Sequence, residues 1–323
     1  MHGLSRHLVD PELLAALDTF PSLVFSAQTL PLMRASLPQF LAMAPPSDVT
    51  DVTMVERYIP GPPGAPEVRV LVYTCDGAEG PSPAYLHMHG GGYVFGVPEL
   101  NDLGNRRLAS DLRCVVVSVD YRLAPEAPFP GAVEDCYAAL VWLHAQAASL
   151  GVDPGRIAIG GESAGAGLAA SLGLLARDRG KAPVAFQMLI YPMLDDRTGA
   201  TSEPHPYAGE FIWTAESNRF GWASLLGGAP GGGDVSRYAA PARAKNLAEL
   251  PPTFIAVGAL DLLLEEDIDF ARRLIRAGVP TELHVYPGAY HAPDMTPEAR
   301  VAKALRRDVL EAMRRAFEEA SPR

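Results

Sequence analysis

The sequence has only three cysteines among 323 residues, and none belongs to a Cys-x-x-Cys pair. We therefore expect Cys75, Cys114 and Cys136 to be buried free thiols, which favours a reducing compartment. The chain does not open on a basic segment followed by a short apolar one, and no run of about 18 apolar residues occurs in it. These absences predict a cytoplasmic protein that does not span a membrane.

Positive charge is also scarce, with 27 Lys and Arg against 38 Asp and Glu and a formal net charge of −11 at pH 7. No block of Lys and Arg stands out, so the sequence does not indicate a nucleic-acid partner. Internal repeats and low-complexity tracts are missing as well. The composition, 48% hydrophobic and 20% charged, is typical of a globular protein with a sizeable core, built as one large α/β domain with an insertion or as two small domains.

Strand and helix patterns alternate along most of the chain. Apolar, β-branched runs bounded by Gly and Pro predict strands at 52–59, 68–74, 84–88, 114–119, 156–160, 184–191, 253–257 and 281–286. Amphipathic or small-residue patterns predict helices at 103–112, 131–150, 163–179, 265–277 and 297–320. This alternation predicts a mostly parallel sheet with helices on both faces, and ligands of such sheets bind beyond the carboxyl ends of the strands.

Two segments depart from the alternation. Residues 1–48 look like an N-terminal arm, with a helix capped by Asp10, a second helical piece near 27–40 interrupted by prolines, and a linker at 44–47. The apolar side chains of this arm need a partner surface, so we expect it to lie across the main domain. Residues 195–247, rich in Gly, Pro and aromatic residues, predict an insertion. The remaining segments, 49–194 and 248–323, then form the main α/β domain.

One stretch has the pattern of a nucleophile elbow. An apolar strand runs into Gly161-Glu162-Ser163-Ala164-Gly165, and a helix of small residues follows. Such a turn projects the serine hydroxyl above the sheet, and a side chain at Gly161 or Gly165 would collide with the neighbouring elements. The helix N-terminus favours developing negative charge. The alternative is a glycine-rich turn with an incidental serine.

A glycine loop follows another predicted strand. His89-Gly90-Gly91-Gly92-Tyr93 leaves backbone amides bare, and an ester hydrolase needs such donors where the tetrahedral oxyanion forms. The alternative is a loop that is merely flexible.

An acid and a histidine complete the pattern at two further strand ends. Asp261 follows the strand at 253–257, and His291 lies in a short Gly/Pro loop after the last strand. Asp261 could instead be a helix N-cap, and His291 a bystander. The competing acids are expected to face water in the first turns of the next helix: Glu265, Glu266, Asp267 and Asp269. The chain order Ser163, Asp261, His291 favours a catalytic triad, because it is the order found in α/β-hydrolases.

Taken together, these motifs resemble the bacterial hormone-sensitive-lipase-like esterases, family IV of the lipolytic enzymes. The resemblance covers nearly the whole chain and rests on His89-Gly90-Gly91-Gly92, Asp120-Tyr121-Arg122-Leu123-Ala124-Pro125-Glu126, Phe129-Pro130, Gly161-Glu162-Ser163-Ala164-Gly165, Asp261 and Tyr286-Pro287-Gly288 with His291. It implies an α/β-hydrolase fold with an eight-stranded sheet, and a cap made of residues 1–48 and 195–247. It also implies oxyanion donors at the amides of Gly91, Gly92 and Ala164, supported by His89, Gly90, Gly161 and Gly165.

The sequence departs from the family at two places. Glu162 stands where the family commonly has Asp or Thr, and we interpret it as a carboxylate that braces the elbow without a catalytic role. Ala292-Pro293 follows His291 where the family usually has Gly-Phe, which puts substrate preference in doubt but not the triad. Arg122 and Glu126 are expected to tie loops together.

The function predicted from the motifs is a serine carboxylesterase that acts through an acyl-enzyme on Ser163, with no metal or cofactor. The family resemblance, with its cap over the site, implies short- to medium-chain esters as substrates. Aromatic residues that could line the pocket, or be core instead, are Tyr93, Phe211, Trp213, Phe220 and Trp222. An arylformamidase-type amidase shares this plan and stays open. A non-catalytic ligand receptor of the fold would lack the triad histidine. The strand at 281–286 could pair across a two-fold axis and form a homodimer.

Overall fold

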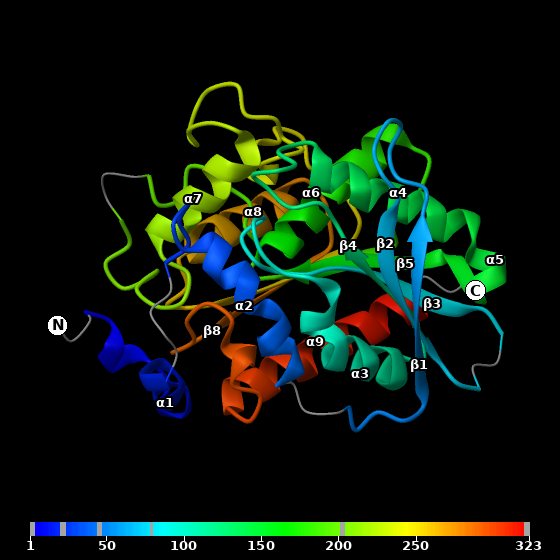
Figure 1. Cartoon of the computed structure of the whole chain (residues 1–323), viewed down its shortest axis with the longest axis horizontal. Coiled ribbons are helices and arrows are strands. Elements are labelled where there is room, and N and C mark those ends of the chain that lie inside the picture. Colours follow the sequence, from blue (N-terminus) through cyan, green and yellow to red (C-terminus); the bar gives the residue numbers. More distant parts are fainter. Residues whose placement is uncertain (1–3, 20–23, 44–46, 78–79, 201–203, 320–323) are drawn as a thin grey trace.

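An eight-stranded sheet runs through the computed structural model, which describes residues 4–19, 24–43, 47–77, 80–200 and 204–319 (Figure 1). The strand order is β1-β2-β4-β3-β5-β6-β7-β8. Strand β2 pairs antiparallel with β1 and β4, and the other neighbours are parallel. The strands are β1 (Val52–Ile59), β2 (Val68–Cys75), β3 (Ser82–Met88), β4 (Val115–Asp120), β5 (Val152–Glu162), β6 (Phe186–Ile190), β7 (Thr253–Gly258) and β8 (Thr281–Tyr286). The predicted mostly parallel, eight-stranded sheet is confirmed.

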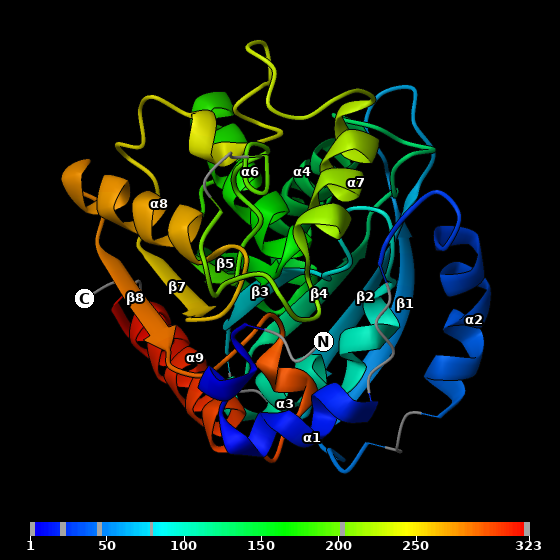
Figure 2. The same ribbon diagram turned by 90° about the vertical axis from the view of Figure 1, so that its left-hand side faces the viewer.

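Helices cover both faces of the sheet, as Figure 2 shows. On one side lie α4 (Gly131–Ala145), α6 (Ala164–Arg179) and α8 (Leu264–Arg276), and on the other α3 (Asp102–Leu112) and α9 (Arg300–Glu319). Strand β4 shows why two cores result. Its successive side chains point to opposite faces, so Val117 joins one apolar core while Val116 joins the other.

The N-terminal arm contributes α1 (Pro11–Thr19) and α2 (Leu30–Ala42). Asp10 caps α1 as expected, because its Oδ1 accepts a hydrogen bond from the Glu12 amide at 3.0 Å. The structure corrects the expected interruption of the second helix, since α2 continues through Pro38. The predicted linker at 44–47 falls mostly outside the described residues.

One helix of the insertion escaped the sequence patterns, namely α7 (Ala215–Leu226). Its start and stop signals are nonetheless present. The hydroxyl of Thr214 accepts from the Ser217 amide at 3.4 Å, and Gly227 ends the helix with a positive φ of 66°.

Short helical segments complete the secondary structure: α5 (Ala147–Leu150) and the 3₁₀ turns η1 (Arg6–Leu8), η2 (Pro98–Asn101), η3 (Pro241–Arg243) and η4 (Pro293–Met295). The three cysteines are buried and unpaired. Across the part of the chain that the structure describes, no helix is both long enough and apolar enough to cross a bilayer.

Candidate active site

The serine, the acid and the histidine meet beyond the carboxyl ends of β5, β7 and β8. The Nδ1 atom of His291 lies 2.8 Å from Oδ2 of Asp261, and its Nε2 lies 3.0 Å from Oγ of Ser163. With Nδ1–H donating to the carboxylate, Nε2 is left to accept from the serine hydroxyl. All three residues are buried, with exposed fractions of 6% or less. The arrangement can take a proton from the hydroxyl and pass it on.

The backbone of Ser163 has the conformation of a nucleophile elbow. Its φ of 55° and ψ of −120° are rare for a residue with a side chain. The strained turn is held by backbone bonds: its amide donates to Ile190 O at 2.9 Å, and its carbonyl accepts from the amides of Gly167 and Met193. The two glycines of the turn are required for close approach, because a Cβ at Gly161 or Gly165 would collide with the Met88 carbonyl oxygen.

Asp261 faces both His291 and the turn before α8, although the N-cap of that helix is Leu263. While Oδ2 faces His291, Oδ1 accepts from the Leu263 amide at 3.0 Å and so supports the turn into α8. Of the competing acids, Glu265 and Asp269 are exposed as predicted.

The expectation that the other two competing acids face water was wrong. Glu266 is 8% exposed and Asp267 is fully buried. Oε1 of Glu266 accepts from the Leu194 amide at 2.6 Å, and burial raises its pKa to about 8. Burial also raises the pKa of Asp267 well above its usual value, and neither of its oxygens has a hydrogen-bond partner among the described residues. Glu266 is buried because this side of α8 packs against the segment that follows β6, at Leu194 and Asp195. Asp267 is the next residue of the same helix.

The glycine loop lies directly beside the elbow. A Cβ added to Gly90 would sit 3.1 Å from Glu162 O and 3.6 Å from the Ser163 Cβ. Gly91 and Gly92 have φ values of 125° and 62°, and a Cβ there would collide with the Phe95 carbonyl or the Trp213 ring. Since Ala164 is the first residue of α6, its amide has no acceptor within the helix.

His89 shapes the glycine loop from within the protein. Its Nδ1–H donates to Gly90 O at 2.8 Å, and its ring stacks on Tyr121 with the centroids 4.3 Å apart. Burial lowers the pKa of His89 to about 4, so the ring is neutral. The Tyr121 hydroxyl donates to the His89 carbonyl at 2.6 Å. This histidine therefore supports the loop through Gly90 and Tyr121.

Three motif residues outside the triad make structural contacts. Glu162 accepts from His87 Nε2 at 3.1 Å and from Asn101 Nδ2 at 3.2 Å, behind the elbow. Arg122 forms a two-pronged pair with the fully buried Asp135 of α4, at 2.7 and 2.8 Å. Glu126 pairs with Arg34 of α2 at 2.7 Å, which joins the N-terminal arm to the loop that precedes α4.

The aromatic candidates for the pocket lie in different surroundings. Trp213 is closest to the triad, with its ring centroid 5.9 Å from that of His291. Tyr93 and Trp222 pack against each other at 5.2 Å and are 1% and 0% exposed, as expected of core residues. Phe211 contacts Tyr290, and Phe220 packs against a small cluster that includes Leu30 and Val94.

Sequence reasoning missed one residue beside the triad, Tyr191. Its ring meets His291 edge-on at 4.8 Å, and it is 3% exposed. The signal was its position, since Tyr191 ends the predicted strand at 184–191 and therefore lies at the same sheet edge as the other site residues.

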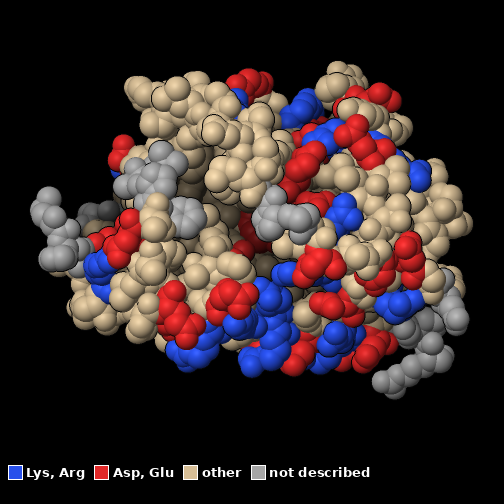
Figure 3. Space-filling model, turned by 60° about the horizontal axis from the view of Figure 1, so that its bottom comes forward, with Lys and Arg blue, Asp and Glu red and all other residues tan. Residues whose placement is uncertain are grey.

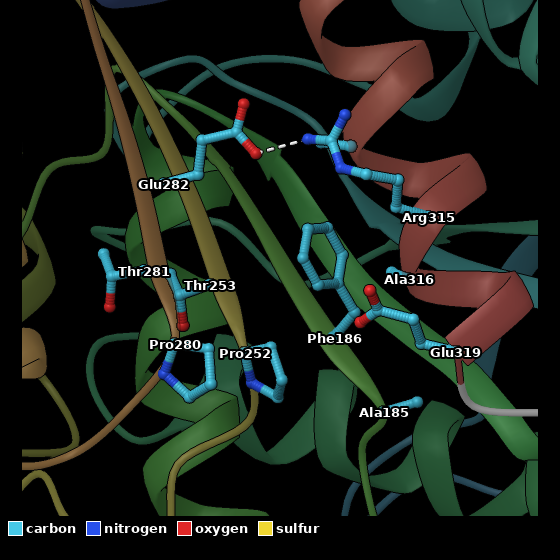
Figure 4. A pocket seen from close by; sticks show the side chains of 11 residues that line it. Ala185, Phe186, Pro252, Thr253, Pro280, Thr281, Glu282, Arg315, Ala316 and Glu319 are labelled. Atoms are coloured by element: carbon cyan, nitrogen blue, oxygen red, sulfur yellow. Dashed lines mark hydrogen bonds and ion pairs between the residues drawn. The ribbon is translucent and has the colours of Figure 1, made fainter.

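A cavity of about 490 Å³ lies at the opposite edge of the sheet, beneath the amino ends of β6, β7 and β8 (Figure 4). Phe186, Pro252 and Pro280 line it, and Arg315 of α9 pairs there with Glu282. It shares no residue with the triad. On the face seen in Figure 3, acidic and basic side chains are interspersed around a hollow. Within the described ranges, no group of three or more His, Cys, Asp or Glu could hold a metal ion.

Comparisons with known proteins agree with the fold. A family model described as alpha/beta hydrolase fold matches residues 85–294. The chain is 35% identical to the carboxylesterase NlhH of Mycobacterium tuberculosis, over 89% of each chain. It is 38% identical to the esterase LipI of the same organism, over 71% of this chain and 76% of LipI. Among solved structures, a bacterial heroin esterase superimposes with a TM-score of 0.91 and 42% identity, covering 96% of this chain and 98% of the other.

Proposed function

The chain belongs to the hormone-sensitive-lipase-like family of the α/β-hydrolase fold and is a carboxylic ester hydrolase, and we propose that it cleaves short- to medium-chain esters through an acyl-enzyme on Ser163. The observation that carries the proposal is the unbroken chain of hydrogen bonds from Asp261 through His291 to Ser163. Each member of this chain has a distinct chemical role.

Acylation begins with a proton transfer within the triad. His291 Nε2 removes the hydroxyl proton as Ser163 Oγ attacks the ester carbonyl, and Asp261 stabilises the imidazolium that forms. The imidazolium then gives its proton to the departing alkoxide, which leaves as the alcohol. Water repeats the sequence on the acyl-enzyme, releasing the carboxylic acid and restoring the serine.

The negative charge of the tetrahedral intermediate falls on the former carbonyl oxygen. We assign its stabilisation to the amides of Gly91, Gly92 and Ala164, which come from the loop and the helix start beside Ser163. Preorganised donors of this kind are each worth about 3 kcal/mol in the transition state. The positive φ values of the two glycines support this assignment, because residues with a side chain rarely adopt this backbone conformation.

Contacts between the arm and the insertion support a cap over the site. The Phe25 amide donates to Ser217 Oγ at 3.0 Å, and the Phe25 ring meets Trp213 at 5.5 Å. Trp213 in turn lies close to both Gly92 and His291. An indole in this position would limit the length of the acyl chain, which supports the proposal of short and medium esters over long ones.

Covalent labelling tests the nucleophile directly. A fluorophosphonate should form one adduct, on Ser163. In Ser163→Ala the adduct should be absent, and kcat should fall by at least about 10⁴-fold. An adduct elsewhere, or full turnover by the variant, would reject the acyl-enzyme on Ser163.

A substrate series tests the acyl and leaving-group preferences. With p-nitrophenyl esters from acetate to laurate, kcat/KM should peak at a short or medium chain and exceed that for aryl formamides. A maximum at laurate would reject the length assignment, and faster turnover of formamides would favour the amidase alternative. Asp261→Asn should reduce kcat by orders of magnitude, whereas Glu265→Gln, an exposed acid four residues on, should not.

A further inference from the structure

The loop that follows His291 has a strained backbone. Ala292, which stands where the family usually has glycine, adopts the left-handed conformation with φ 57° and ψ 55°. Residues with a Cβ rarely take this conformation, and it persists only where surrounding contacts hold it. Something must therefore fix the loop, and with it the imidazole of His291.

Tyr191 contacts both the loop and the histidine. Its hydroxyl donates to Asp294 Oδ1 at 2.7 Å, and its ring meets the His291 ring edge-on at 4.8 Å. Tyr191 is itself anchored, because its amide donates to Ala256 O of β7 at 2.6 Å and its side chain is buried. A side chain fixed to the sheet thus supports the histidine with its ring and the histidine's own loop with its hydroxyl.

Resting on the serine-hydrolase function proposed above, we propose that Tyr191 and Asp294 are a positioning pair for His291. Tyr191 holds the imidazole in line with Ser163, and the Asp294 carboxylate favours the imidazolium that forms when the serine attacks.

Several charged or titratable groups face this pair. His291 faces Ser163, Asp261 and Tyr191, with Asp267 of α8 behind Asp261. Asp294 accepts from the Tyr191 hydroxyl, and the charges of His291 and Glu162 act on its carboxylate. On α9, which packs against η4, Arg300 pairs with Asp10, and Lys303 pairs with Glu298.

Asp294 is exposed as a whole residue, but its Oδ1 accepts from the buried Tyr191 hydroxyl. Desolvation of the carboxylate and the negative charge of Glu162 raise the pKa of Asp294, and the Tyr191 hydroxyl and His291 act in the opposite direction. The attraction between Asp294 and a positively charged His291 is mutual, so the carboxylate stabilises the imidazolium formed when the serine attacks. Asp261 favours the same protonated form from the Nδ1 side.

Two substitutions separate charge from geometry. Asp294→Asn keeps an oxygen that can accept from Tyr191 but removes the charge, so the acid limb of kcat/KM for p-nitrophenyl acetate should move to lower pH by about half a unit. Its alkaline plateau should stay within about threefold of the parent value. Tyr191→Phe keeps the ring but removes the hydroxyl, so kcat should fall about tenfold while KM changes little.

The matched control is Glu298→Gln, which removes an exposed acid four residues beyond Asp294. Its acid limb and kcat should equal those of the parent. The double variant Tyr191→Phe/Asp294→Asn should lose less activity than the two single losses multiplied together, because both act on one contact. Rates of fluorophosphonate labelling at Ser163, measured beside thermal unfolding, show whether His291 still activates the serine in a folded protein.

An unmoved acid limb in Asp294→Asn overturns the electrostatic part of the proposal, and full kcat in Tyr191→Phe overturns the positioning part. Both failures are distinct from failure of the proposed function, because they would occur in a protein whose Ser163 is still labelled and still required. If the parent protein itself is not labelled at Ser163, the proposed function fails first and this pair has no role to play.

Discussion

Replacing Glu266 by glutamine should change how the stability of the protein depends on pH. Burial raises the pKa of Glu266 from 4.5 to about 8, so between these values the folded protein holds a proton that the unfolded chain has released. The contribution of protonated Glu266 to the free energy of unfolding is therefore complete below about pH 4.5, and it is lost as the pH rises through about 8. At about 1.4 kcal/mol for each pKa unit, the loss from this group is about 5 kcal/mol.

Glutamine keeps the geometry and removes the titration. Its side-chain oxygen can still accept from the amides of Leu194 and Asp195, which lie 2.6 and 3.2 Å from Oε1 in the parent. Urea unfolding at a series of pH values should give nearly equal free energies for parent and variant near pH 5. Near pH 9 the variant should be more stable by several kcal/mol, on the order of the loss derived above.

The exposed neighbour Glu265 provides the control, since Glu265→Gln should leave the pH dependence unchanged. Two results would refute the reasoning. One is a Glu266→Gln curve that runs parallel to the parent at every pH. The other is a variant that is less stable than the parent at high pH, because it would mean that the ionised carboxylate is the favoured form.

Four other substitutions have definite expected outcomes. Gly92→Ala places a Cβ against the Trp213 ring at a φ of 62°, so kcat should fall about 10²-fold in steady-state assays of p-nitrophenyl acetate; an unchanged kcat would remove Gly92 from the oxyanion site. Trp213→Ala should move the optimum of the ester series toward longer chains, and an unchanged optimum would show that the indole does not limit length. Arg34→Ala removes bonds to two backbone carbonyls and to Glu126, so the free energy of unfolding should fall by about 1–3 kcal/mol in urea titrations. Glu126→Gln removes only the charge of the exposed partner, so it should lower the free energy of unfolding by less than about 1 kcal/mol.

The sheet could be predicted from the sequence, and so could the meeting of Ser163, Asp261 and His291, because both depend on local patterns combined with one rule of topology. Strands such as β4 and β7 are runs of mostly apolar residues that need no long-range information to be recognised. Parallel strands end at the same sheet edge, so residues that follow β5, β7 and β8 must come near one another. Ser163, Asp261 and His291 are then within reach although up to 128 residues separate them.

Other features could not be predicted because they depend on which surfaces pack together. Tyr191 supports His291 only because β6 and β7 are neighbours, and the strained Ala292 is visible only in the folded backbone. The contact between Phe25 and Trp213 joins two irregular segments whose patterns do not indicate a partner. The roles of those segments as a cap, and of the aromatic residues as a pocket, stay predictions.

The burial of two acids near the start of α8 could have been predicted from the helical spacing of the sequence. Buried apolar residues on this helix include Phe270, Ala271 and Leu274, which follow helical spacing. Positions 266 and 267 lie four residues before 270 and 271, so the same periodicity places Glu266 and Asp267 on the inward side and leaves Glu265 in water.

Burial alone therefore does not identify the acid that serves the histidine. The oxygens of Asp261 accept from His291 and from the Leu263 amide, and such bonds stabilise a carboxylate. Asp267 is equally buried but has neither kind of donor among the residues described, so its neutral form is favoured. A neutral carboxyl cannot offset the charge of an imidazolium. What selects Asp261 is its place in the turn before the helix, where an amide and an imidazole both point at it.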